Sequence, residues 1–121
     1  MSALELAQSL IKIKSVSPND EGCFDLIEAQ LIPLGFAIER VPELNCETLL
    51  AKFGDSGKVF CFLGHTDIVP SGPEEEWTSP PFEANIIDGE LIGRGAADMK
   101  GSVAVFIAVS YTHLRAHETN S

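Results

Sequence analysis

Three side chains in this sequence have the types and the spacing of a metal site. His65 and Asp67 follow the apolar run 59–63 and are separated by one residue, so in an extended segment both point the same way. Asp98 lies within "GRGAADMKGS", residues 93–102, where glycines let the backbone bend and approach a ligand closely. Histidine plus carboxylate favours zinc, cobalt or manganese. The sequence therefore predicts a site for a divalent cation.

The role of Asp67 is left open by the residues alone. A metal-bound histidine faces the ion with one ring nitrogen and usually donates the other to an orienting partner. Asp67 is either that partner of His65 or its near neighbour. A His-x-Asp pair by itself is more often structural, and the loop that carries Asp98 is what favours a metal here.

A glycine-rich loop is also typical of a phosphate site. A P-loop requires Gly-Lys-Ser/Thr in that order, whereas Lys100 precedes Gly101 in this chain. The carboxylate of Asp98 would also repel a phosphate. We therefore favour a cation over a phosphate as the ligand of this loop.

Other charged residues are weaker candidates. The acidic run 74–76 lies in a proline-rich loop and is expected to be solvated. Lys100 and Arg94 either contact an acidic substrate or pair with carboxylates on the surface. His113 and His117 have the i, i+4 spacing of a helical metal pair.

Length and composition set limits on the class of protein. With 121 residues, 45% hydrophobic and 21% charged, the chain can form one compact domain. The formal charge of −10 argues against nucleic acid or an anionic membrane as a partner, because phosphates would be repelled. No targeting signal or membrane-spanning run is recognisable. Three widely spaced cysteines fit no disulfide framework, Cys61 reads as a small core residue, and a reducing cytoplasm is expected.

The elements that must position these residues follow from hydrophobic periodicity. "SALE" at residues 2–5 has capping-box spacing, and "DG" at 88–89 indicates a hairpin. We predict helices over 3–14, 20–34 and 102–109, strands over 36–41, 48–53 and 58–63, and a hairpin over 85–92. The strand 58–63 is apolar throughout, as in the centre of an α/β sheet, where ligands bind beyond the carboxyl ends of strands.

Several motifs together resemble a known family. "GHTDIVP" at 64–70, Trp77, "PPFE" at 80–83 and "DGELIGRGAADMKGS" at 88–102 are similar, in order and spacing, to the di-zinc metallopeptidases and deacylases of the aminoacylase and carboxypeptidase G2 clan. The resemblance covers residues 3 to about 109. It implies an α/β fold, the amino-terminal part of a zinc-peptidase-like catalytic domain with a mixed central sheet flanked by helices.

The resemblance also implies roles for the three candidate residues. His65 would ligate one zinc, Asp98 would bridge two, and Asp67 would steer His65 and count among the catalytic residues. The implied activity is hydrolysis of the amide bond of a small N-acyl amino acid by a water that zinc activates, with cobalt as a possible substitute. The intact enzyme is expected to be a homodimer.

The chain departs from the family towards its end. The family's acidic pair, its further carboxylate ligand, its late histidine ligand and its inserted dimerisation domain have no counterpart among these residues. "SYTHLRAHETNS" at 110–121 breaks the apolar stripe of the preceding helix. We therefore expect residues 1–109 to be a partial catalytic domain, residues 110–121 to be a tail foreign to the family, and His113 and His117 not to be native ligands.

Overall fold

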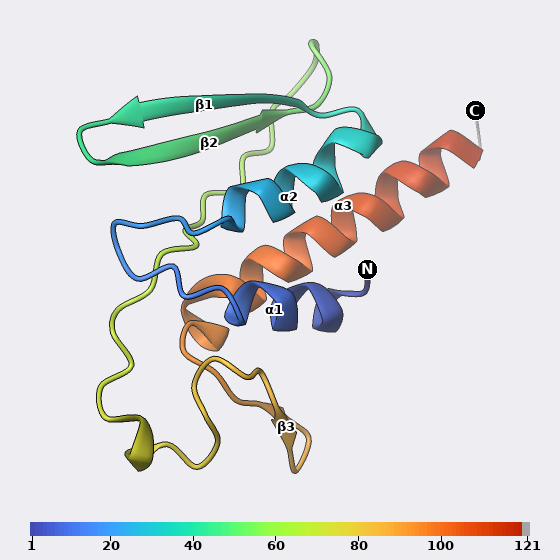
Figure 1. The fold of residues 1–121 in the computed structure, drawn as a ribbon. Coiled ribbons are helices and arrows are strands. Elements are labelled where there is room, and N and C mark those ends of the chain that lie inside the picture. The colour runs from blue at the N-terminus through green and yellow to red at the C-terminus, as the bar shows by residue number, and fades with distance from the viewer. Residues whose placement is uncertain (120–121) are drawn as a thin grey trace.

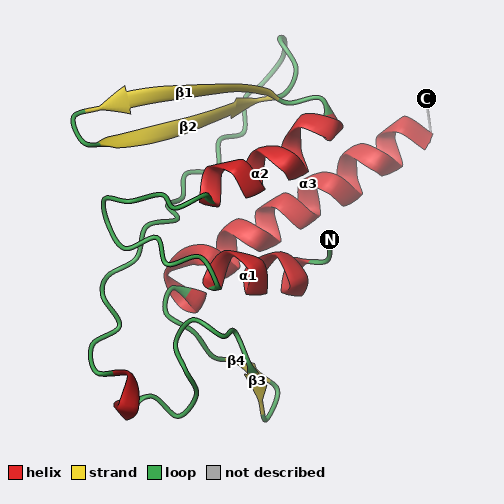
Figure 2. Ribbon diagram, viewed as in Figure 1, coloured by secondary structure: helices red, strands yellow, loops and turns green. Residues whose placement is uncertain are grey.

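The computed structural model describes residues 1–119, with side chains up to residue 114. Three helices, α1 (Ala3–Ile11), α2 (Cys23–Leu31) and α3 (Gly101–Thr119), lie next to one another, and the hairpin of β1 (Ala37–Glu43) and β2 (Cys46–Lys52) lies beside α2 (Figure 1). Between β2 and the short hairpin of β3 (Ile86–Ile87) and β4 (Glu90–Leu91), the chain is almost entirely loop (Figure 2). No described helix is long and apolar enough to cross a bilayer.

Helix α1 begins where the capping signal predicts. The hydroxyl of Ser2 accepts a hydrogen bond from the backbone N–H of Glu5 at 3.1 Å and donates one to the Glu5 carboxylate at 3.0 Å. Leu6 and Leu10 are buried on the inner face of the helix. The predicted helix 3–14 is confirmed, although it ends at Ile11.

Helix α2 is shorter than predicted at both ends. The carboxylate of Asp20 accepts hydrogen bonds from the backbone N–H groups of Gly22 and Phe24, which places the start of regular helix at Cys23. At the other end, Pro33 has no N–H to donate, and the α-helix gives way to a 3₁₀ turn over 32–34. Gly35 then leaves the turn with a φ of +99°.

One arginine joins the β1–β2 hairpin to α2 by two ion pairs. The strands pair antiparallel from Ala37 opposite Lys52 to Glu43 opposite Cys46, close to the predicted strands 36–41 and 48–53. Arg40 on β1 bonds to Asp25 and Glu28 on α2, each at 2.7 Å. Ile38 on β1 and Leu49 on β2 also pack against the buried cluster of the helices.

The core lies between the three helices. Val103, Ala104 and Ile107 on α3 are buried against residues of α1 and α2, which confirms the predicted final helix. The backbone continues as helix past Val109 to Thr119. The side chain of His117 lies outside the described residues. The buried apolar members of this cluster are Leu6, Ala7, Leu10, Cys23, Ile27, Leu31, Val103, Ala104 and Ile107.

The predicted central strand 58–63 is wrong. The segment forms no strand, and Val59, Phe60 and Leu63 are 90%, 85% and 89% exposed. Cys61, expected in the core, is also exposed. Burial of such a run requires neighbouring strands, and no described strand pairs with this one.

The α/β class is confirmed, with helices and strands in one chain. The described strands form two separate two-stranded antiparallel sheets, β1–β2 and β3–β4, and not the expected mixed central sheet. A single parallel bridge joins Val16 to Ile68. The predicted hairpin over 85–92 is confirmed, and its turn residues Asp88 and Gly89 have φ values of +51° and +80°.

Two leucine substitutions measure the difference between the core and the exposed segment. Leu10→Ala should lower the free energy of unfolding by about 2–5 kcal/mol, because it leaves a cavity at a fully buried position. Leu63→Ala should change it by no more than about 0.5 kcal/mol, since that side chain is already in water. Urea unfolding followed by circular dichroism measures both values. Equal losses would mean that segment 58–63 is buried after all.

Candidate metal centre

The segment that carries His65 is fixed by pairing with the chain that follows α1. The backbone N–H of Ile68 donates to the carbonyl of Ser15, and the N–H of Ser17 donates to the carbonyl of Ile68, both at 3.0 Å. Ile68 itself is buried. The backbone at His65 and Asp67 is therefore anchored in an extended segment, and their side chains project into solvent.

The structure brings the three predicted site residues together. Nε2 of His65 lies 2.9 Å from Oδ1 of Asp98. Nδ1 of the same ring lies 3.0 Å from the backbone carbonyl oxygen of Asp67 and 3.3 Å from its Oδ1. One ring nitrogen thus faces Asp98 while the other is held by Asp67, which is the arrangement expected of a metal ligand and its orienting partner.

Asp98 reaches His65 because the helix that follows starts irregularly. It lies in the wide turn η3 (Ala96–Lys100), and its own φ and ψ of −126° and 87° are not helical. The turn approaches the His65 segment closely at Gly95, where φ is +86° and a Cβ atom would lie 2.6 Å from Cγ2 of Ile68. Glycine at this position therefore allows the two loops to meet.

The donor atoms fit a divalent cation. A tetrahedral zinc with bonds of about 2.0–2.1 Å separates a nitrogen and an oxygen ligand by roughly 3.3 Å, a few tenths more than the separation of His65 Nε2 and Asp98 Oδ1. A small movement of two exposed side chains would make up the difference. Within the described residues no group of three or more His, Cys, Asp or Glu side chains could hold a metal ion, so His65 and Asp98 could supply only part of a ligand set.

The surroundings of His65 favour its protonated form when no metal is bound. Partial burial alone lowers the pKa of His65, but hydrogen bonds to the Asp67 carbonyl and the Asp98 carboxylate outweigh it and raise the pKa above its usual value. A proton on Nε2 would lie between that nitrogen and Asp98, where a cation would also bind.

Lys100 is a residue that sequence reasoning misjudged. It contacts neither solvent nor a surface carboxylate, since it is fully buried and its Nζ donates to the carbonyls of Leu10 and Ile13 at 2.7 and 2.8 Å. Burial lowers the pKa of this lysine. No signal in the sequence pointed to this contact, because the helix predicted over 3–14 has Lys12 and Lys14 near its own end.

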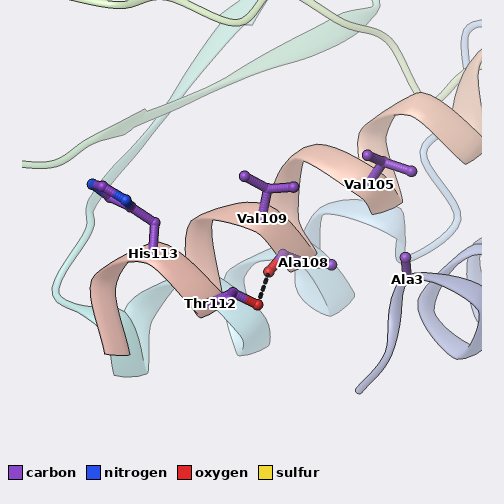
Figure 3. Close-up of a pocket in the computed structure, with 6 residues that line it drawn as sticks. All are labelled: Ala3, Val105, Ala108, Val109, Thr112 and His113. Atoms are coloured by element: carbon purple, nitrogen blue, oxygen red, sulfur yellow. Dashed lines mark hydrogen bonds between the residues drawn. The ribbon is translucent and has the colours of Figure 1, made fainter. Parts of the chain in front are cut away.

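The remaining charged candidates lie apart from His65. Arg94 stacks over the ring of Trp77, 5.0 Å from its centroid, instead of pairing with an acid. The indole N–H of Trp77 donates to the carbonyl of Ser71 at 3.0 Å. The acidic run 74–76 is exposed, as expected. His113 borders a shallow, largely apolar hollow along α3 that also includes Ala3 (Figure 3).

Comparison with known proteins identifies the family. The profile of peptidase family M20/M25/M40 matches residues 61–120, about half of the chain. Succinyl-diaminopimelate desuccinylase of Hydrogenovibrio crunogenus is 54% identical over 108 residues, which cover 88% of this chain and 29% of that protein. The enzyme of the same name from Alkalilimnicola ehrlichii is 51% identical over 111 residues, 92% of this chain and 30% of that protein. This chain belongs to the M20/M25/M40 peptidase family.

The fold agrees with this assignment. The crystal structure of human carnosine dipeptidase 1 superposes with a TM-score of 0.77 and 24% sequence identity, over 95% of this chain and 28% of that one. The family resemblance seen in the sequence is therefore confirmed. The chain spans about 30% of the length of the curated relatives that it matches.

The contact between His65 and Asp98 predicts a pH effect in the metal-free chain. Because the folded pKa of His65 is raised, its contact stabilises the fold below the pKa of an unfolded histidine, and this stabilisation is lost as pH rises through the folded value. Asp98→Asn should therefore lower the pKa of His65 in an NMR titration of its ring protons. Asp55→Asn, in the turn after β2, serves as the control. An unchanged pKa in Asp98→Asn would contradict the contact.

Proposed function

We propose that this chain is part of a metal-dependent amide hydrolase that removes succinate from N-succinyl-LL-2,6-diaminopimelate, a step of bacterial lysine and diaminopimelate biosynthesis. The observation that carries the proposal is the pairing of His65 Nε2 with Asp98 Oδ1, in a chain more than half identical to a named desuccinylase. The proposed location is the cytoplasm, in line with the absence of disulfides among the described cysteines.

Within this proposal the three residues have separate tasks. His65 and Asp98 would hold zinc, or cobalt in its place, through Nε2 and a carboxylate oxygen, and Asp98 would be shared between two ions. Asp67 would orient the imidazole because its backbone carbonyl, at 3.0 Å, and its carboxylate, at 3.3 Å, can accept a hydrogen bond from Nδ1–H, and Asp67→Ala removes the carboxylate alone. Zinc, when bound, supplies Lewis acidity and lowers the pKa of water to about 7, which makes a nucleophile available at neutral pH.

The described residues leave two requirements of this chemistry to other parts of the protein. They contain no group of three or more His, Cys, Asp or Glu side chains that could hold a metal ion, and the acidic pair that supplies the family's general base has no counterpart among them. We propose that both come from segments outside these 121 residues, in a homodimeric enzyme. The division at residue 109, with a foreign tail beyond it, stays a prediction.

A substrate panel tests the proposal. The zinc-loaded protein, expressed from the complete reading frame that contains these residues, is assayed with N-succinyl-LL-diaminopimelate and with N-acetylornithine at equal concentrations. Preference for the succinyl substrate supports the proposal. Preference for the acetyl substrate would make the protein a related deacylase, and no hydrolysis of either would contradict an amide hydrolase of this kind.

Two alanine variants of the same protein separate the ligand from its orienting partner. His65→Ala should lose one zinc and nearly all turnover, because it removes a metal ligand. Asp67→Ala should keep most of the metal but lose about 10–100-fold in metal affinity or activity, as loss of an orienting partner does. Metal content by mass spectrometry and turnover are measured together. Wild-type turnover in either variant would contradict the assigned role.

A further inference from the structure

Both halves of the candidate metal centre are attached to one short stretch of chain. This stretch, residues 10–15, comprises the end of α1 and the residues just after it. Lys100 bonds to it from the Asp98 side, and Thr66 bonds to it from the His65 side. We name it the 10–15 stretch.

On the Asp98 side the connection is a buried ammonium group. Lys100 follows Asp98 by two positions, and its Nζ donates to the carbonyls of Leu10 at 2.7 Å and of Ile13 at 2.8 Å. Its own backbone N–H donates to the carbonyl of Gly95 at 2.7 Å. The turn that presents Asp98 is thus closed within itself and fastened to the 10–15 stretch.

On the His65 side the connection is a buried hydroxyl group. Oγ of Ser15 donates to the backbone carbonyl of Thr66 at 2.7 Å, and both residues are buried. Thr66 is buried between two exposed residues, His65 and Asp67, and its side chain faces the protein interior. The N–H of Ile68 adds a second bond to the carbonyl of Ser15 at 3.0 Å.

Apolar side chains could fill the same space in the core, so the polar groups in these contacts indicate a further role. A buried ammonium group is costly unless its protons are bonded, and an apolar side chain of similar size would occupy the space without that cost. Two short bonds to carbonyls at the negative end of α1 offset the cost and also fix the position of Nζ. Buried polar contacts of this kind specify one arrangement of the backbone.

We propose that Lys100 and Ser15 are positioning residues of the candidate metal centre, which fasten the Asp98 turn and the His65 segment to the same stretch of backbone. Their effect is to keep Nε2 of His65 and Oδ1 of Asp98 close together, within a few tenths of an ångström of the spacing that a cation needs, although neither Lys100 nor Ser15 contacts a ligand. The inference rests on the proposed function insofar as the site is used for metal.

The test uses Lys100→Met and Ser15→Ala in the protein expressed from the complete reading frame that contains these residues, with Co²⁺ as the probe. Each variant removes one of the two fastenings, the buried hydrogen bonds of Lys100 or of Ser15, and leaves His65 and Asp98 unchanged. We expect each to weaken Co²⁺ binding about 10-fold, the lower end of the range for residues behind the ligands. Titration of the visible absorption of Co²⁺ measures the affinity, and circular dichroism reports how much of each variant is folded.

A second readout needs no metal. The ¹⁵N resonance of His65 Nε2 is recorded at one fixed pH, with Asp98→Asn as the reference for a broken contact. Lys100→Met and Ser15→Ala should both move this resonance towards its position in Asp98→Asn. If the wild-type protein of complete length binds no Co²⁺, the metal proposal fails, and the resonance still decides whether the two residues position His65 and Asp98.

Two control variants separate positioning from general stability. Lys12→Met makes the same substitution on an exposed lysine at the end of α1 and should leave both readouts unchanged. Ile107→Ala loosens the core on α3 without touching either fastening. If Ile107→Ala changes the His65 resonance as much as Lys100→Met does, or if both fastening variants leave it unchanged, the proposal is overturned. Should Lys100→Met not fold, Ser15→Ala decides.

Discussion

The structure depends on how the carboxyl-terminal end of α1 is closed. A helix leaves its last carbonyls without partners, and α1 has no basic side chain in its last turn to bind them. Lys100, ninety positions further along the chain, supplies that cation from the turn that leads into α3. Because α3 contributes a third of the buried residues between the helices, the contact of Lys100 with α1 couples the packing of this core to the position of Asp98.

The electrostatics of the site follow from its exposure and from the charge of the chain. His65 and Asp98 are accessible, and the chain carries a formal charge of −10, so cations are attracted and anions are repelled. The carboxylate of Asp98 also raises the pKa of His65. At the proposed metal site a proton and a metal would therefore compete for one position, and metal affinity should weaken with increasing acidity.

The features that could be predicted from the sequence are those that short-range patterns determine. The cap at Ser2, the Asp-Gly turn of the β3–β4 hairpin and the glycine-framed loop around Asp98 each depend on a few adjacent residues. The juxtaposition of His65 and Asp98 was predicted because two independent motifs pointed to the same chemistry, and the geometry agrees.

What could not be predicted was set by distant neighbours. Segment 58–63 has the composition of a buried strand, but composition does not provide the adjacent strands that would bury it. Lys100 looked like a surface residue because its two acceptors are backbone carbonyls some ninety positions away, and carbonyls are present in every residue. Neither local propensity nor motif spacing contains that information.

The exposed segment and the partial ligand set are features of the same edge of the molecule. Phe62 and Phe60 approach the ring of Phe106 on α3, at 4.4 and 6.5 Å between centroids, so the segment already lies along the helix with its backbone unpaired among the described residues. The next residues along the chain are Gly64 and His65. A strand that paired with this segment would bring its own carboxyl or amino end beside His65. A single segment that packed here could therefore cover the exposed apolar side chains and also supply the remaining ligands of the proposed metal site.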